Sequence, residues 1–293
     1  MKTRCRSLVN PSLRRSLGVL AVVAATTVGF AAGDALAAPH GSAATIAGHS
    51  ERGAMDYDWS WRLAPGQTIE IEGVNGAIHA TGAAGKDVVV HARKHARRSD
   101  PDRVTIEVIE HAGGITLCVR YPDVRGHRNE CAPHGGSHMS TSNNDVSVDF
   151  DVQVPAGVHL AARTVNGEVE ARGLEADAEA HTVNGSVTLE TRGRAEATTV
   201  NGSVSARLGS TGVNESLDFS TVNGSITLEL PKDACAEVTA RNVNGGIETD
   251  FPITVRQAGF MGHQLRGTIG RGGPQIDLST VNGSIRLRKA RGI

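Results

Sequence analysis

A four-residue phrase, Thr-Val-Asn-Gly, recurs along this chain and constrains its fold more than any other feature. Val or Ile stands two positions after the glycine in every copy. Five copies are complete and two keep only Val-Asn-Gly, which places Asn-Gly pairs at Asn75-Gly76, Asn166-Gly167, Asn184-Gly185, Asn201-Gly202, Asn223-Gly224, Asn244-Gly245 and Asn282-Gly283. With a degenerate copy at Gly267, the spacing from Gly167 onward is 16 to 22 residues. Repeats of this length are typical of solenoids.

An Asn-Gly pair between alternating apolar runs is also a strong hairpin signal. A tight hairpin at Asn223-Gly224 would pair Phe219 with Leu228 on one face. The repeat favours a solenoid instead, because a hairpin turn does not need the same Thr and Val before every pair. In parallel coils, equivalent residues stack about 4.8 Å apart, asparagines can form a hydrogen-bonded ladder, and glycine permits the positive φ of a sharp corner.

We therefore predict an all-β fold, a single-stranded parallel β-solenoid with Val-Asn-Gly corner repeats. Length differences between coils would go into outward loops. The inner face is predicted to carry small and medium aliphatic side chains and one aromatic ring, which are Ala178, Ala180, Val187, Leu189, Leu217, Phe219, Ile226 and Leu228.

The first 37 residues have the features of a secretory signal peptide. Basic residues precede a 16-residue apolar run at 17–32, and Ala35-Leu36-Ala37 offers a cleavage site. The run is shorter than the ~20 residues that a membrane span needs, so we predict export and no membrane span after signal cleavage. Residues 38–55 are small and polar and are predicted to be a disordered leader. Residues 56–293 are predicted to form the β-solenoid domain.

Strand-like runs also precede the repeat array, and they are rich in Val and Ile. They are Thr68–Ile71, Val88–Ala92, Val104–Ile109, Ile115–Tyr121 and Val146–Val154. The segment Pro122–Asn144 interrupts this pattern with Gly, His, Ser and Asn, and we predict a long loop there. Cys118 and Cys131 bracket part of this loop and are predicted to form a disulfide in an oxidising compartment. Cys235 lies between two alanines and is predicted to be a small buried core residue.

Both ends of a solenoid present strand edges that must be protected. The final strand, Ser284–Lys289, alternates cations with apolar residues and is predicted to protect one end. Near the other end, Tyr57, Trp59 and Trp61 fall on one face of a strand-like run. These rings either cover the first coil, which is the favoured interpretation, or form a possible ligand surface that stacks on sugar rings.

These motifs together resemble the bacterial putative-adhesin family, an exported β-solenoid domain of unknown function. The resemblance rests on Gly66–Gly76, Ile115–Pro122, Asp145–Phe150 with Val154–Gly157, and the Thr-Val-Asn-Gly array, and it spans residues 56–293. It implies a right-handed, pectate-lyase-like coil and a location at the cell envelope or surface. It implies no catalytic residues.

The charge pattern favours binding over catalysis. The chain has 30 basic and 31 acidic residues and lacks the strongly basic balance of a nucleic-acid binder. Cleavage of a polysaccharide would need carboxylates clustered on one face of neighbouring coils. The outward acids after the phrase, which are Glu168, Glu170, Glu190 and Glu229, do not line up. We therefore predict no acidic stripe and no enzymatic activity.

Two histidine-containing segments are candidate binding sites. The loop residues His127, Cys131, His134 and His138 match no familiar zinc spacing, so no metal site and no cofactor are predicted. The basic run from His91 to Arg98 is interpreted as a solvated face in preference to a site for acidic glycans or lipid head groups.

The sequence thus predicts an exported, non-enzymatic binding or structural module, periplasmic or at the cell surface. Its partner would be a glycan, a surface polymer or an envelope protein. An envelope-stress sensor that binds a peptide or lipid is the alternative, and a polysaccharide-active enzyme is the less favoured one.

Overall fold

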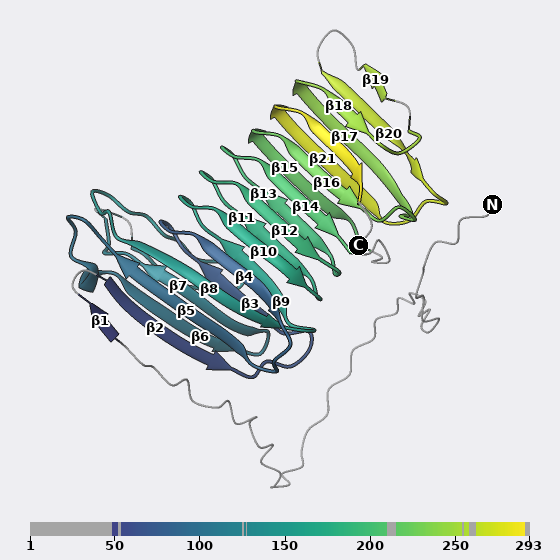
Figure 1. The fold of residues 1–293 in the computed structure, drawn as a ribbon. Coiled ribbons are helices and arrows are strands. Elements are labelled where there is room, and N and C mark those ends of the chain that lie inside the picture. The colour runs from purple at the N-terminus through teal and green to yellow at the C-terminus, as the bar shows by residue number, and fades with distance from the viewer. Residues whose placement is uncertain are drawn as a thin grey trace, which may run out of the picture.

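The computed structural model describes residues 49–51, 54–124, 126, 128–209, 215–253, 255–257 and 262–290. The predicted signal peptide and most of the predicted leader lie outside these residues. The fold is all-β, and apart from the short helix η1 (Pro101–Arg103) its regular elements are strands. The strands form two sheets of eleven strands each, here called sheet A and sheet B (Figure 1). In the described part of the chain, no helix has the length and apolar character to cross a bilayer.

The chain alternates between the two sheets along its repeat array. Sheet B takes the strand before each Asn-Gly pair and sheet A takes the strand after it. In chain order these are β9 (His159–Arg163), β10 (Val169–Leu174), β11 (Ala178–His181), β12 (Val187–Thr191), β13 (Ala195–Thr198), β14 (Val204–Leu208), β15 (Leu217–Asn223) and β16 (Ile226–Leu230). Each strand pairs in parallel with the strand one coil away. This arrangement is that of a β-solenoid, with the Asn-Gly pairs at its corners.

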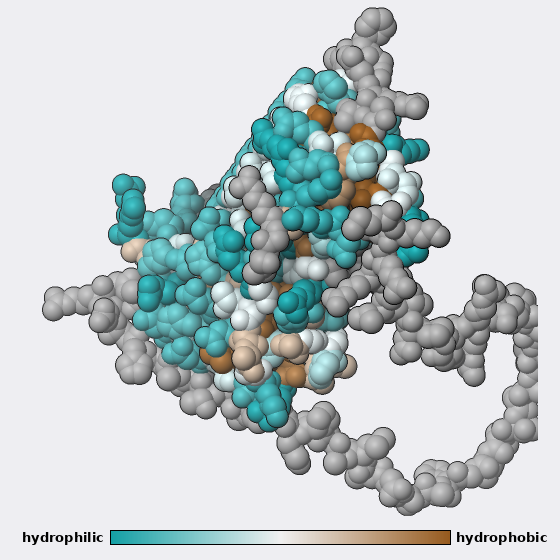
Figure 2. All heavy atoms as spheres, turned by 45° about the vertical axis from the view of Figure 1, so that its right-hand side comes forward, coloured by the Kyte–Doolittle hydropathy of each residue, from teal (hydrophilic) through white to brown (hydrophobic). Residues whose placement is uncertain are grey.

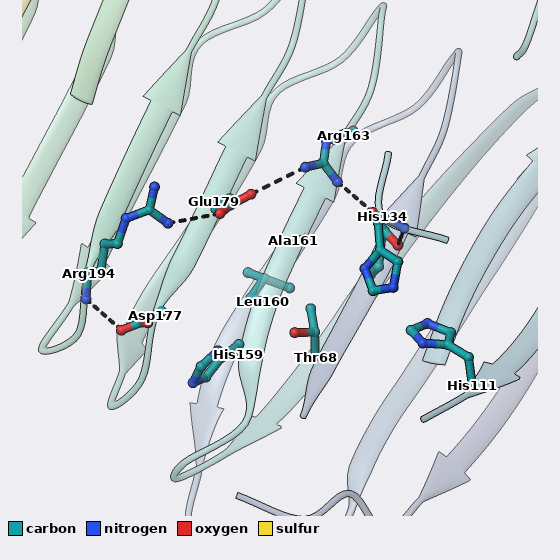
Figure 3. A pocket seen from close by; sticks show the side chains of 11 residues that line it. Thr68, His111, His134, His159, Leu160, Ala161, Arg163, Asp177, Glu179 and Arg194 are labelled. Carbon is teal, nitrogen blue, oxygen red and sulfur yellow. Dashed lines mark hydrogen bonds and ion pairs between the residues drawn. The ribbon is translucent and has the colours of Figure 1, made fainter. Parts of the chain in front are cut away.

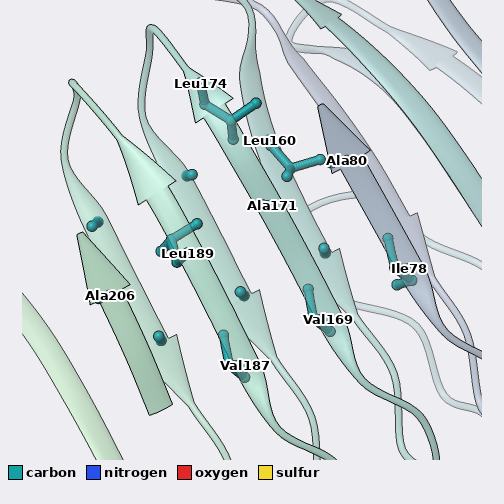
Figure 4. Close-up of a cluster of buried hydrophobic side chains, with 14 of the residues drawn as sticks. Ile78, Ala80, Leu160, Val169, Ala171, Leu174, Val187, Leu189 and Ala206 are labelled. Carbon is teal, nitrogen blue, oxygen red and sulfur yellow. The ribbon is translucent and has the colours of Figure 1, made fainter. Parts of the chain in front are cut away.

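The hairpin alternative at Asn223-Gly224 is therefore wrong. Phe219 pairs across sheet B with Ala197, whereas Leu228 pairs across sheet A with Ala206. The eight residues predicted for the inner face are each at most 1 % exposed. In Figure 4 equivalent side chains of neighbouring coils, such as Val169 and Val187, follow one another along the core. Small aliphatic side chains suit this narrow space between two sheets.

The N-terminal end is closed by antiparallel strands. The first coil is β3 (Thr68–Glu72) and β4 (Ile78–Ala83), and beyond it β7 (Gly114–Arg120) and β8 (Ser147–Pro155) add in parallel. Antiparallel strands then extend both sheets outward, and they are β1 (His49–Glu51), β2 (Ala54–Trp61), β5 (Val88–His95) and β6 (Thr105–His111). The predicted strand positions in this region are confirmed to within a few residues.

The C-terminal end departs from chain order. The last coil in the sequence, β21 (Gln275–Asn282) and β22 (Ile285–Lys289), lies between the coil β15–β16 and the coil formed by β17 (Ala236–Asn244) and β18 (Ile247–Thr249). The predicted end-protecting role of the final strand is therefore wrong, because β22 is internal and β18 is the edge of sheet A. Arg288 of β22 pairs with Glu248 at 2.6 Å and with Asp250 at 3.1 Å.

The degenerate copy at Gly267 is not a coil of the stack. It lies in β20 (His263–Ile269), which runs antiparallel to β17 and carries the short strand β19 (Val255–Gln257) on its other side. A copy without Val-Asn has no corner to turn, so β20 returns along β17 and extends sheet B instead.

The seven corner asparagines form one ladder. The stacking order is Asn75, Asn166, Asn184, Asn201, Asn223, Asn282 and Asn244, and from Asn166 onward each side-chain Nδ2 donates to the Oδ1 of the asparagine before it at 2.8–2.9 Å. The first, Asn75, donates its Nδ2 to the Val146 carbonyl at 3.3 Å. At the five corners with a complete phrase, the buried threonine donates its Oγ1 to the glycine carbonyl of the preceding coil, as Thr199 does to Gly185 at 2.8 Å. At the Asn244 corner, where Asn242 stands in place of threonine, Asn242 Nδ2 donates to the carbonyl of Gly283 at 3.1 Å.

The corner glycines are needed chiefly because the coils approach closely. A Cβ on Gly185 or Gly202 would overlap the carbonyl oxygen of the corner glycine in the coil before it. A positive φ was the predicted reason, and it holds at Gly76 (129°) and Gly245 (135°) but not at Gly185 or Gly202. Close backbone approach is the second circumstance in which only glycine fits.

Candidate functional site

The aromatic strand β2 faces the core. Trp59 and Trp61 are 5 % and 4 % exposed, and Tyr57 is half-buried. The three rings stack in a row, with centroids 5.8 and 6.3 Å apart. The interpretation of these residues as a sugar-stacking surface is therefore wrong, because tryptophans this deeply buried present no ring face to a ligand. Their position matches a cover over the N-terminal end of the core.

Cys118 on β7 and Cys131 in the following loop form a disulfide, with their Cα atoms 5.8 Å apart. The loop Pro122–Asn144 contains no strand among its described residues, and its segment around His134 folds against the outer face of sheet B. Cys235, the core residue of the sequence prediction, is 7 % exposed.

Glu70 on β3 is the buried centre to which this loop attaches. Its two carboxylate oxygens accept hydrogen bonds from Thr116 Oγ1 and from the backbone N–H groups of His134 and Gly135, each at 2.8 Å. Arg163 Nη1 of β9 donates to Glu70 Oε1 at 2.6 Å. Burial alone would raise the pKa of Glu70, but these hydrogen bonds and the charge of Arg163 outweigh it and lower that pKa. Glu70 is therefore a fixed carboxylate with its acceptor sites occupied.

Glu72, two residues along β3, is in the opposite situation. It is 7 % exposed, and its Oε1 has no hydrogen-bond partner within the described residues. Arg163 approaches that oxygen only to 3.9 Å. Burial raises the pKa of Glu72, and the neighbouring charge of Glu70 raises it further, against the lowering effect of Ser137 and Arg163.

A hollow of about 270 Å³, here called the histidine pocket, opens on the outer face of sheet B beside Glu70 (Figure 3). Its floor is Ala161 on β9, which pairs with Glu70 on one side and with Glu179 on the other. Ala161 is small where its neighbours carry carboxylates, and the hollow results from this difference. The pocket is lined by Thr68, Glu70, His111, His134, His159, Leu160, Ala161, Arg163, Asp177, Glu179 and Arg194.

One wall of the histidine pocket is a chain of ion pairs. Arg163 Nη2 lies 3.3 Å from Glu179 Oε2, and Arg194 Nη1 lies 3.0 Å from Glu179 Oε1. Arg194 also pairs with Glu196 at 2.7 Å. The dashed lines in Figure 3 follow this chain from Arg194 through Glu179 to Arg163. Each guanidinium in the wall is therefore neutralised and held in position.

The opposite wall of the histidine pocket carries the imidazole rings of His111 and His134. His111 Nδ1 accepts the backbone N–H of Gly113 at 3.2 Å, so its Nε2 is placed to donate to Thr116 Oγ1 at 3.1 Å. Thr116 in turn donates to Glu70. The His111 and His134 rings meet edge to face with centroids 5.0 Å apart. A hydrogen-bonded relay thus fixes His111, and His134 packs on it.

Carboxylates do line up on sheet B, so the prediction of no acidic stripe is wrong. The residue five positions before each corner asparagine lies in one cross-strand row, which is Glu70, Ala161, Glu179, Glu196, Asp218, Asp277 and Thr239. Burial, together with the charges of Glu196 and Asp277, raises the pKa of Asp218. The row lies on the strands before the phrase, whereas the outward acids considered from the sequence follow it. An alignment of the repeats on their asparagines makes the row visible in the sequence.

The basic run from His91 to Arg98 is divided by the fold. His91 pairs with Asp58 at 2.8 Å and Arg93 with Asp56 at 3.2 Å. Lys94 is 3 % exposed and donates to the Val104 carbonyl. The run is therefore no continuous basic patch, and only its end at Arg97-Arg98 remains without an ion pair among the described residues.

The other histidines of the Pro122–Asn144 loop show no metal site. His127 lies outside the described residues, and Cys131 is in the disulfide. Among the residues that the structure describes, no group of three or more His, Cys, Asp or Glu side chains is arranged to hold a metal ion.

Comparisons with known proteins identify the family. The profile described as Toastrack DUF4097 matches residues 101–288. A crystal structure of a putative cell adhesion protein from Clostridium sporogenes is 12 % identical, covering 80 % of this chain and 100 % of its own, with a TM-score of 0.46. A putative adhesin from Bacteroides fragilis is 14 % identical, covering 82 % of this chain and 98 % of its own, with a TM-score of 0.38. No curated protein matches the sequence.

The profile covers more than half of the 293 residues, including the whole array of complete repeat phrases. This match confirms the resemblance that the repeat phrases indicated, and the chain belongs to the Toastrack DUF4097 family.

Proposed function

We propose that the protein is an exported, non-enzymatic binding module of adhesin type at the bacterial cell envelope, whose ligand is a glycan or another surface polymer. The observation that carries the proposal is the histidine pocket on the outer face of sheet B. The pocket opens onto strands that are in register from coil to coil. Side chains on this face therefore repeat at about 4.8 Å, which suits an extended ligand with a repeating structure.

The chemistry of the pocket supports a polyhydroxylated ligand. Ala161 supplies an apolar floor, while Thr68, His111, His134 and His159 place hydroxyl and imidazole groups around it. Binding sites for small ligands typically combine an apolar surface with a few polar groups in fixed positions. A sugar ring has both an apolar face and a rim of hydroxyl groups, so it fits this combination.

The state of the charged groups supports binding without catalysis. Hydrolysis of a glycosidic bond needs one carboxylic acid that can give up a proton and one carboxylate that can act as base or nucleophile. Glu70 is held ionised by its four donors, and Glu179 is shared between Arg163 and Arg194. The hydrogen bonds and the charge of Arg163 lower the pKa of Glu70, and both Glu179 oxygens are engaged by arginines, so neither carboxylate is free for such a role.

The proposal of export rests on the signal-peptide features of residues 1–37.

We also propose that the coil is right-handed and pectate-lyase-like. A crossover connection that returns a chain to the same sheet in parallel is right-handed in about 98 % of cases. The unit β9–β10–β11 is such a connection, with β10 as the crossover strand. A crystal structure that shows a left-handed coil would contradict this part of the proposal.

A glycan array probed with labelled residues 38–293 tests the function. Ala161→Leu fills the floor of the histidine pocket and is expected to abolish binding to the glycans that the unaltered protein retains. Thr188→Leu, a similar enlargement on the outer face of sheet A, is the matched control and should bind normally. Equal binding by both variants, or no binding by the unaltered protein, would overturn the role of the pocket. New reducing or unsaturated ends after incubation with polyuronates and calcium would overturn the non-enzymatic assignment.

A further inference from the structure

A second hollow, here called the arginine pocket, lies between η1 and the Pro122–Asn144 loop and has a volume of about 600 Å³. Pockets of this size commonly hold small molecules or single sugar units. It shares no residue with the histidine pocket. Most of its lining residues are polar, and the lining consists of Arg98, Ser99, Asp100, Arg103, Pro122, Asp123, Val124, Thr141, Ser142, Asn143 and Asn144.

The two arginines of this pocket carry charges that the described chain does not neutralise. The backbone of Arg98 is anchored, because its N–H and that of Ser99 donate to the Asp145 carboxylate at 3.1 and 2.8 Å. No acidic side chain among the described residues lies within ion-pair distance of the guanidinium of Arg98 or Arg103. This contrasts with the histidine pocket, where Arg163 and Arg194 are both saturated by carboxylates.

The two carboxylates in the lining are directed to the backbone. Asp100 Oδ1 accepts the N–H of Asp102 at 3.0 Å, and Asp123 Oδ1 accepts the N–H of Asn129 at 2.9 Å. Each carboxylate keeps a second oxygen that can accept a hydrogen bond from a ligand hydroxyl. The lining therefore offers separate places for a negative charge and for hydroxyl groups.

The loop side of the pocket presents hydroxyl and amide groups from Ser142, Asn143 and Asn144. Ser142 and Asn143 are exposed, so a ligand in the pocket can reach them. Thr141 belongs to the same wall, but its Oγ1 is closed off from solvent.

We propose that the arginine pocket binds an acidic sugar, namely a uronate unit of an anionic polysaccharide. The guanidinium groups of Arg98 and Arg103 bind the sugar carboxylate, since arginine presents paired donors that match a carboxylate. Ser142, the asparagines and the free oxygens of Asp100 and Asp123 bind the ring hydroxyls. This inference goes beyond the proposed function, because it names the ligand class and assigns it to a different site.

Calorimetric titration of residues 38–293 with an oligogalacturonide tests the proposal. The matched ligand is the same oligosaccharide as its methyl ester, which keeps the hydroxyls and lacks the charge. The free acid is expected to bind at least ~10-fold more tightly than the ester, since a hydrogen bond to a charged group is worth 1.5–3 kcal/mol. The double variant Arg98→Gln/Arg103→Gln should lose this preference.

Two controls separate this site from other effects. Arg172→Gln removes an exposed arginine that pairs with Glu170 and should leave binding unchanged. Ala161→Leu, which closes the histidine pocket, should also leave oligogalacturonide binding unchanged. The proposals for the two pockets can therefore be tested separately. Thermal melting of each variant checks that it is folded. Equal affinity for acid and ester, retained preference in the folded double variant, or no binding of the free acid would each overturn the proposal.

Discussion

The short distance between neighbouring coils explains why glycine occupies the last position of the repeat phrase. A Cβ at Gly202 would overlap the carbonyl of Gly185, whereas a Cβ at Gly85 would meet nothing within 4 Å. Gly202→Ala is expected to lower the free energy of unfolding by ~3 kcal/mol, the upper range for overpacking. Gly85→Ala is the matched control and should change it by less than about 0.5 kcal/mol. Urea denaturation of both variants measures the difference, and equal stability would contradict the close-approach explanation.

Glu72 lowers stability when it is ionised. Its pKa in the folded protein is raised above the ordinary 4.5, so the folded state holds the proton more tightly than the unfolded state. The cost is therefore absent below pH 4.5 and is fully present above the folded-state pKa. We expect Glu72→Gln to stabilise the protein at neutral pH by ~1 kcal/mol, the order of a buried acceptor without a partner. Denaturation at several pH values should show this gain shrink towards acid pH.

Glu70→Gln is the control for that measurement, because the pKa of Glu70 shifts in the opposite direction. Burial would raise this pKa, but the hydrogen bonds to Glu70 and the charge of Arg163 outweigh burial and lower it. Stability from Glu70 is present at neutral pH and is lost as the pH falls through its folded-state pKa. Its replacement should destabilise the neutral protein by about 1.5–3 kcal/mol. Stabilisation by both replacements, or by neither, would contradict the distinction between the two carboxylates.

Asn244 differs chemically from the other corner asparagines. In an Asn-Gly pair, the glycine nitrogen can attack the side-chain amide, release ammonia and form a succinimide that water opens to aspartate or isoaspartate. At the six other corners the glycine N–H donates to the asparagine carbonyl of the next coil, as Gly185 does to Asn201 at 3.0 Å. Gly245, in the outermost coil, has no such acceptor among the described residues.

We therefore expect Asn244 to deamidate about tenfold faster than the other six, the factor that corresponds to a hydrogen bond of ~1.4 kcal/mol. Peptide mass spectrometry after incubation at mildly alkaline pH measures all seven sites in one sample. A uniform rate at the seven asparagines would show that the terminal position makes no difference.

At the scale of elements, the notable feature is the coil β21–β22. It is last in the sequence, yet it lies between β15–β16 and β17–β18 and supplies hydrogen-bond partners to both. Removal of residues 275–293 therefore takes out an inner coil. Once this coil is gone, β18 has no strand to pair with, and β17 keeps only the antiparallel strand β20.

We expect that truncation after residue 274 abolishes the cooperative thermal transition. Deletion of residues 38–53, whose described part is the edge strand β1, is the comparison and should retain it. Circular dichroism melting measures both proteins. A truncated protein that still melts cooperatively near the temperature of the full chain would show that β21–β22 is dispensable.

At the scale of the whole molecule, both ends of the stack are protected against further strand addition. Antiparallel strands extend sheets A and B at the N-terminal end, and β20 and β19 extend sheet B at the other. The exposed edge of sheet A there is β18, which is only three residues long. Polar side chains also cover most of the face seen in Figure 2. Short edges and antiparallel covers are devices that keep β-proteins from pairing edge to edge.

Purified residues 38–293 are therefore expected to be monomeric. Size-exclusion chromatography with light scattering, repeated over a wide range of protein concentration, measures this. A mass that rises with concentration, or the growth of fibrils, would show that an edge is open after all.

The repeat phrase determined the coil, the corners and the inner face from sequence alone, because each depends on local period and on identical neighbours. The strands before the array, the aromatic cover and the disulfide partners also followed from local pattern. The stacking order at the C-terminal end did not, because parallel strands of similar pattern can pair in more than one order, and only the packed structure selects one.

The same reason explains the sites. The acidic row, the chain from Arg194 to Glu70 and both pockets bring together side chains from separate coils and loops, so no local pattern marks them. Burial likewise decided that Trp59 and Trp61 are core residues, since strand period places both rings on one face without saying which face is inside. The Thr-Val-Asn-Gly phrase thus specified the corner and the inner face of each coil. Tertiary contacts specified the order in which coils stack and the side chains that meet at the acidic row and the two pockets.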